Sequence, residues 1–215
     1  MIQDKLPLNI FNLIRNGDME LVQELIDSNE IDINQCDSVG NNVMMRLLKA
    51  KEYDMVLKLM KKRNWKVNHQ NDEGNTFGHL LVMDQDVRAF KVLKALCKKK
   101  NFYPNIKNKN NETILDKAIQ NNYLYASVQI LEDKRFDNID MNTFMKLWNT
   151  CIKSNYYGKY SKLNNLDILV DSLEKKNLIP DIRRIIDVIR KNIELIRKEI
   201  MNNNLQIVDS YLFSY

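Results

Sequence analysis

The stretch Asn71-Asp-Glu-Gly-Asn-Thr-Phe-Gly-His-Leu-Leu81 decides the fold of this chain, because similar stretches lie on both sides of it. They begin at Asp37 and Asn108. One position is common to all three and is filled by Gly40, Gly74 and Asn111, which are 34 and 37 residues apart. Glycine adopts a positive φ freely and asparagine tolerates it best among the other residues, so this position predicts three equivalent tight turns. A regular spacing of this length predicts an internal repeat.

Apolar residues follow each turn in two short runs. The runs cover residues 43–48 and 55–60 after the first turn, 80–82 and 90–96 after the second, and 114–119 and 128–131 after the third. Spacings of three and four place each run on one helical face, so each repeat is predicted to contain two short antiparallel helices. Such a pair cannot bury its apolar face alone and has to stack on its neighbours.

This pattern resembles the ankyrin repeat over about residues 6–140. The stretch that begins at Asn71 is similar to the family's D-x-x-G-x-T-P-L-H-x-A, and the matching residues are Gly74, Thr76 and His79. Residues 14–26 are similar to A-x-x-G-H-x-E-I-V-x-x-L-L, and the matching residues are Gly17, Glu20, Val22 and Leu25. The departures are Phe77 in place of proline, Asn42-Val-Met-Met45 in place of T-P-L-H, and Asp116 in place of histidine.

The resemblance implies an all-α fold: an ankyrin-repeat helical solenoid of about four repeats, including an amino-terminal cap, over residues 1–140. It also implies a non-enzymatic adaptor that binds a partner protein on its concave face, through the turn tips and the first helices. The partner-binding positions that it implies are Ser38, Val39, Asn41, Lys49, Asp72, Glu73, Asn75, Met83, Asp84, Lys109, Asn110, Glu112, Gln120 and Asn121.

The repeat pattern fades after about Asp140, and residues 141–215 are predicted to form a helical region made of one degenerate repeat and capping helices. Thr143 is a candidate cap for a helix that carries Phe144, Leu147 and Cys151, residues 155–161 indicate a loop, and a second helix is expected to stop near Pro180. The clearest helical stripe of the chain follows: Ile182, Ile185, Ile186, Ile189, Ile193, Ile196 and Ile200. We interpret it as the face of a capping helix, and the alternative is a self-association or partner-docking face.

Composition supports the helical class. The chain has 215 residues with 44% apolar residues but only 3 prolines and 5 glycines, which is few for a sheet protein with many tight turns. It has no run of about 20 apolar residues and no secretory signal. Its three cysteines are widely spaced and suggest no disulfide framework. We therefore expect a monomer without a membrane segment in a reducing intracellular compartment, either cytoplasm or nucleus, or a host cytosol if the chain comes from a pathogen.

The sequence carries no recognisable catalytic, cofactor-binding or metal-binding motif. The glycines are too dispersed for a phosphate-binding loop, and no C-x-x-C pair suggests zinc. Of the two histidines, the resemblance gives His79 a structural role between loops, and His69 is expected to be exposed. Cys97 is expected to be a small buried residue. We therefore predict no enzyme activity, no cofactor and no metal.

Positive charge is concentrated in the middle of the chain. Residues 35–110 contain sixteen basic and seven acidic residues, and the basic ones include the triplets 61–63 and 98–100. We interpret the triplets as helix ends, where cations interact favourably with the helix dipole. Two alternatives remain open: a surface that attracts an acidic protein, and a basic platform that binds nucleic acid or another anionic surface. The second is disfavoured because no nucleic-acid-binding signature is present.

Overall fold

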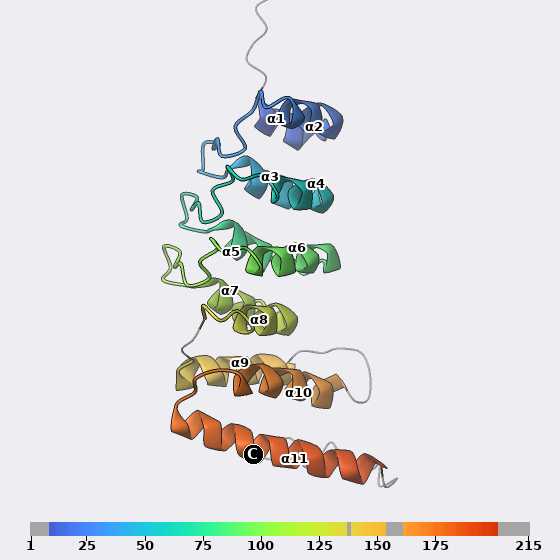
Figure 1. Ribbon diagram of the computed structural model, residues 1–215, viewed down its shortest axis with the longest axis vertical. Helices are drawn as coiled ribbons and strands as arrows, with labels where there is room; N and C mark the ends of the chain where they lie inside the picture. The colour runs from blue at the N-terminus through green and yellow to red at the C-terminus, as the bar shows by residue number, and fades with distance from the viewer. Residues whose placement is uncertain (1–8, 137–138, 154–160, 202–215) are drawn as a thin grey trace, which may run out of the picture. The chain divides into compact units, whose positions relative to one another are not determined.

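The computed structural model describes residues 9–136, 139–153 and 161–201 of the chain. These residues form eleven α-helices, and their only extended pairing is two isolated bridges, Cys36 with Asn42 and Gln70 with Thr76. The predicted all-α class is therefore confirmed (Figure 1). The helices belong to two compact units that divide between Asn121 and Asn122, whereas the sequence pattern predicts a change near residue 140.

The amino-terminal unit contains seven short helices. They are α1 (Ile10–Asn16), α2 (Met19–Asp27), α3 (Val43–Lys49), α4 (Tyr53–Leu59), α5 (Phe77–Leu81), α6 (Val87–Cys97) and α7 (Ile114–Gln120). Three antiparallel pairs form, α1 with α2, α3 with α4 and α5 with α6 (Figure 1). Helices α1, α3, α5 and α7 pack in succession along one row, and α4 packs on α6 in a second row. We call the first row the inner helices.

Polar side chains determine where the inner helices begin. The Asn42 Oδ1 atom accepts a hydrogen bond from Met45 N–H at 3.0 Å and starts α3. Thr76 starts α5, and its backbone N–H donates to the His79 Nδ1 atom at 3.1 Å. Asp116 plays the same part for α7. Its carboxyl accepts from the backbone N–H and the hydroxyl of Thr113, at 2.9 and 2.7 Å. The predicted departure at Asp116 thus preserves the cap.

The carboxyl-terminal unit contains four helices. They are α8 (Leu124–Leu131), α9 (Met141–Lys153), α10 (Ser161–Glu174) and α11 (Pro180–Met201). Helix α10 packs on α8, α9 and α11. Helix α9 begins before the predicted cap, because the Asp140 carboxyl accepts from Thr143 N–H at 2.7 Å. Residues 155–160 of the predicted loop lie outside the described residues, and Ser161 begins α10.

The apolar stripe of α11 is buried over most of its length. Ile182, Ile186, Ile193 and Ile196 are buried, which agrees with a helix that packs its stripe against α10. Ile185 is 37% exposed and Ile189 is half-buried, and the side chain of Ile200 lies outside the described residues. The stripe is therefore narrower than predicted.

Two arginines of α11 bind the acidic face of α10. The Arg190 guanidinium pairs with Asp167 at 2.9 Å and Glu174 at 2.9 Å, and also with Asp171. Hydrogen bonding to Glu174, followed by Asp171, raises the pKa of Arg190. Arg197 pairs with Asp167 as well. Because these partners lie on another helix, the spacing along α11 gave no sign of them.

Candidate functional site

Three turns of the amino-terminal unit are built by one short polar side chain each. In the first turn, the Asp37 Oδ1 atom accepts from the backbone N–H groups of Val39 and Asn41, at 3.0 and 2.9 Å. Asn71 and Asn108 accept from the equivalent N–H groups of their own turns at 2.9–3.1 Å. The residue with positive φ is the predicted one each time: Gly40 (73°), Gly74 (75°) and Asn111 (61°). Side chain and backbone together therefore fix the shape of each turn.

Neighbouring turns are hydrogen-bonded to one another. The Asp72 N–H donates to the Val39 carbonyl at 3.2 Å, and the Lys109 N–H donates to the Glu73 carbonyl at 3.0 Å. This contact explains why two of the three positions are glycine. A Cβ at Gly40 would lie 2.8 Å from the Asp72 nitrogen, and a Cβ at Gly74 would lie 2.7 Å from the Lys109 nitrogen. The turns therefore stack too closely for any other residue at these positions.

Two predicted partner-binding residues, Asn41 and Asn75, are buried in this contact. They are 1% and 5% exposed. The Asn41 Oδ1 atom accepts from the Asn71 Nδ2 group at 3.0 Å, and the Asn75 Oδ1 atom accepts from the Asn108 Nδ2 group at 2.9 Å. A partner cannot reach them without separating the turns, so we remove both from the predicted surface. Their role is to support the turns.

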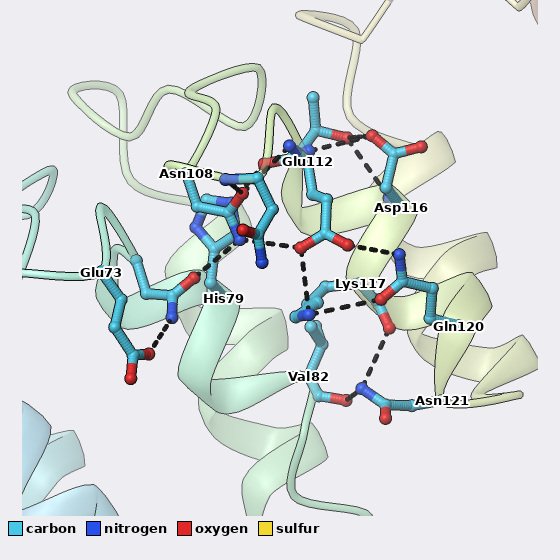
Figure 2. Close-up of polar contacts among 12 residues, drawn as sticks. Glu73, His79, Val82, Asn108, Glu112, Asp116, Lys117, Gln120 and Asn121 are labelled. Atoms are coloured by element: carbon cyan, nitrogen blue, oxygen red, sulfur yellow. Dashed lines mark hydrogen bonds and ion pairs between the residues drawn. The ribbon is translucent and has the colours of Figure 1, made fainter.

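His79 links the second and third turns (Figure 2). Its Nδ1 atom accepts from Thr76, and its Nε2 atom lies 3.0 Å from the Glu112 carbonyl oxygen, which can only accept. The ring is therefore neutral and carries its proton on Nε2. Burial lowers the pKa of His79. The structural role expected for this residue is confirmed, because both ring nitrogens already have partners.

The Glu112 carboxylate is at the centre of a second polar cluster (Figure 2). It accepts from Asn108 Nδ2 at 2.9 Å and from Gln120 Nε2, and it pairs with Lys117 Nζ at 3.0 Å. These hydrogen bonds, from Asn108 first, then Gln120 and Lys117, lower the pKa of Glu112 to about 2. The predicted surface residues Glu112 and Gln120 therefore bind each other within the chain, and a partner would meet them as a pre-formed cluster.

Asn121 and Asp84 also have partners within the unit. The Asn121 Nδ2 group donates to the Lys117 carbonyl at 3.0 Å, and Gln85 donates to the Asn121 carbonyl at 2.8 Å. Asp84 accepts from the Tyr53 hydroxyl, and burial together with Asp84 raises the pKa of Tyr53. Both residues are half-buried, and they fix the ends of α5 and α7.

The other predicted positions are exposed: Ser38, Val39, Lys49, Asp72, Glu73, Met83, Lys109, Asn110 and Gln120. Six of them lie at the turns and three on the inner helices or at their ends. Two are apolar: Val39 is 46% exposed and Met83 is 52% exposed. We call these nine residues the turn face. It combines acidic, basic and apolar side chains on a backbone that its own hydrogen bonds hold in place.

A groove that the sequence analysis missed lies beside the first turn. It has a volume of about 880 Å³ and is lined by residues of α1, the first turn and α3. Its lining includes Arg15 and Arg46, which the repeat pattern did not single out, together with Ser38 and Lys49, which it did. The resemblance assigns contact positions from the turns and the helices that follow them. Since α1 precedes the first turn, its residues carried no such signal.

Each basic triplet contributes one lysine to the structure of the unit. The Lys62 Nζ group donates to the Ile26 carbonyl at 2.7 Å, next to the end of α2. The Lys99 Nζ group lies 5.6 Å from the centre of the Trp65 ring. Lys61, Arg63, Lys98 and Lys100 are exposed. Lys62 therefore lies at a helix end, as the interpretation of the triplets predicts, although the end that it contacts is that of α2.

The histidines and cysteines of this chain are of the residue types that most commonly act as metal ligands and nucleophiles. No group of three His, Cys, Asp or Glu side chains among them could hold a metal ion. His69 was expected to be exposed, but it is half-buried and its Nε2–H group donates to the Gly40 carbonyl at 2.7 Å. Cys36 is exposed, Cys151 is buried, and Cys97 is half-buried rather than buried as predicted.

None of the helices in the described part of the chain combines the length and the apolar composition that crossing a membrane requires. No model of a known protein family matches this sequence, and no curated protein matches it either.

Proposed function

We propose that this chain is a non-enzymatic protein-binding module built as an ankyrin-like solenoid, and that the turn face holds a partner protein. The observation that carries the proposal is the construction of the turns. Their backbone groups bond to their own Asp or Asn side chain and to the next turn, while Asp72, Glu73 and Lys109 remain exposed. A surface whose backbone is already fixed loses little conformational freedom when it binds.

The composition of the turn face supports a protein as the ligand. Val39 and Met83 offer apolar contacts on a face that also carries exposed charged residues of both signs. Protein interfaces combine apolar and polar contacts in this way. A nucleic-acid surface would instead be expected to carry basic residues nearly throughout. Asp72 and Glu73 lie at the middle turn, where they would repel phosphate.

The experiment is an affinity capture from cell extract with matched charge variants. Asp72→Arg with Glu73→Arg reverses two exposed acids of the turn face. Glu24→Arg with Glu30→Arg reverses two exposed acids on and just after α2 and serves as the control, because the net charge changes equally. We expect the control to retain the same protein as the wild type and the turn-face variant to lose it. Circular dichroism establishes first that all three are equally folded.

Two outcomes would contradict the proposal. If the turn-face variant captures the same proteins as the wild type, the turn face is not the binding surface. If the captured material is nucleic acid and is released steeply by salt, the basic platform takes the place of the adaptor, since phosphate contacts weaken strongly with ionic strength. A protein interface with an apolar centre weakens much less.

A further inference from the structure

We propose that the groove beside the first turn binds an extended acidic segment of the partner, with an apolar side chain anchored on its floor. The inference rests on the proposed function and adds to it the chemistry of one part of the partner. It concerns the groove between α1, the first turn and α3, which lies at one end of the turn face.

The walls of the groove differ in character. Phe11 of α1 is half-buried and offers the accessible apolar surface of the floor, and Ile10 and Ile14 beside it are buried. Polar groups of the first turn, including Ser38, form the opposite wall. With a volume of about 880 Å³, the groove is large enough for several peptide side chains. A binding site for a peptide needs both features, an apolar anchor and polar groups that orient the chain.

The charge of the groove selects an acidic ligand. Three cations line it, Arg15, Arg46 and Lys49, against one carboxylate, Asp37. Asp37 pairs with Arg46 and also caps its own turn, so its charge is already compensated within the groove. Arg15 donates to the neutral Asn12 side chain at 3.0 Å, which leaves its charge uncompensated at that contact. The lining therefore has an excess of two positive charges.

Two other occupants fit this lining less well. A second copy of the chain would have to present acids next to apolar residues to a groove of this charge. Glu20 with Leu21 and Glu194 with Leu195 are exposed pairs of this composition, but they lie within the helices α2 and α11 and are not extended segments. A nucleic acid would satisfy Arg15 and Lys49 through its phosphates but offers no aliphatic side chain to the half-buried Phe11. An acidic peptide with a leucine or phenylalanine satisfies both walls.

Cys36 provides a site-specific reporter, because it lines the groove and is the exposed cysteine of the chain. Its alkylation by iodoacetamide is followed by mass spectrometry of the digested protein, so Cys97 and Cys151 need no replacement. The ligands are two pools of peptides of about ten residues. One pool is made from Asp, Glu, Leu, Phe, Gly and Ser, and the other has Lys and Arg in place of Asp and Glu.

We expect the acidic pool to slow the alkylation of Cys36 by about tenfold when the binding peptides are present near ten times their Kd. Arg15→Glu with Lys49→Glu should abolish this protection. Lys61→Glu with Lys91→Glu, which changes the net charge equally at exposed positions outside the groove, should preserve it. Circular dichroism confirms that each variant is folded before labelling.

Three results would overturn the inference. The first is that, in the wild type, the two pools protect Cys36 equally or neither pool protects it. The second is protection that survives in Arg15→Glu with Lys49→Glu. The third is faster alkylation of Cys36 without peptide when Leu6 and Leu8 are changed to serine, which would make residues 1–8 the occupant. The affinity capture separates this inference from the proposed function. If Arg15→Glu with Lys49→Glu still captures the partner that Asp72→Arg with Glu73→Arg loses, the proposed function stands and only this inference fails.

Discussion

The two compact units hold their helices together by different means. In the amino-terminal unit, short helices of 5–11 residues are joined by turns whose Asp and Asn side chains bond to the backbone and whose neighbours bond to one another. In the carboxyl-terminal unit, α11 has 22 residues and packs a row of isoleucines against α10, with Arg190 bound to three acids beside it. Both units bury apolar side chains, but the first adds hydrogen bonds between its turns, whereas the second adds an ion cluster beside its buried stripe.

The difference bears on function. A turn that is fixed by its own hydrogen bonds can expose its remaining side chains, so the amino-terminal unit can offer many contact positions without losing its shape. A buried stripe does the opposite, because its side chains are used by the fold. We therefore propose the turns, rather than the stripe, as the binding surface. Substitutions in the two units should change the free energy of unfolding in different ways, through burial, backbone conformation, salt and pH.

The largest effect is expected in the stripe of α11. Ile186→Ala removes a side chain that is 1% exposed and should lower the free energy of unfolding of the carboxyl-terminal unit by about 3–4 kcal/mol. Ile185→Ala is the matched control, since Ile185 is itself 37% exposed and its truncation should cost less than about 1 kcal/mol. Amide hydrogen exchange in α10 and α11 measures both. Equal costs would mean that the stripe does not pack as described.

The close approach of the turns gives the next effect. Gly74→Ala adds a Cβ 2.7 Å from the Lys109 nitrogen at a residue with φ 75°, so strain and overlap together should cost about 2–3 kcal/mol. Gly17 has a similar φ of 84° but nothing within 4 Å of the added Cβ. Gly17→Ala should therefore cost only about 1 kcal/mol for the backbone conformation. Thermal unfolding of the two variants separates overlap from strain, and a larger loss for Gly17→Ala would contradict the stacking.

The ion cluster of Arg190 should contribute less. Arg190→Met keeps much of the side-chain volume but leaves Asp171 and Glu174 without this cation, and it should cost about 1–2 kcal/mol at low salt. The loss should shrink as salt is raised, because the cluster is partly exposed. Arg190→Lys, which keeps the charge, is the control. A loss that does not change with salt would show that packing rather than charge makes the contribution.

The sequence predicted the turns better than their surroundings. Gly40, Gly74 and Asn111 were identified because a positive φ restricts residue choice at a single position. The burial of Asn41 and Asn75 was missed, because it arises from contact with the next turn, thirty or more residues away. The same holds for the contact of Arg190 of α11 with α10 and for the groove beside α1. A required local conformation restricts the residue type at one position and can be recognised there. A contact between distant polar side chains produces no pattern that a single sequence can show.

The smallest effect, and the one most specific to the amino-terminal unit, is the pH dependence that His79 introduces. In the folded chain its pKa is lowered from the ordinary value of 6.5, because it is buried. Below pH 6.5, His79 is protonated in the unfolded chain but stays neutral in the folded chain until the pH reaches the lowered pKa. The free energy of unfolding should therefore be fully maintained above pH 6.5 and fall as the pH drops toward the lowered pKa, with a slope of at most about 1.4 kcal/mol per pH unit for one proton.

His79→Gln removes this titration and His69→Gln serves as the control, since His69 is half-buried and bonds to a carbonyl at another turn. Urea unfolding between about pH 5 and 7.5 should show a flatter profile for His79→Gln than for the wild type or the control. Because protonation of Nδ1 would end its hydrogen bond from Thr76 N–H, the loss should appear first in the amide exchange of α5. If α10 and α11 in the carboxyl-terminal unit lost protection equally, the pH dependence would not come from this histidine.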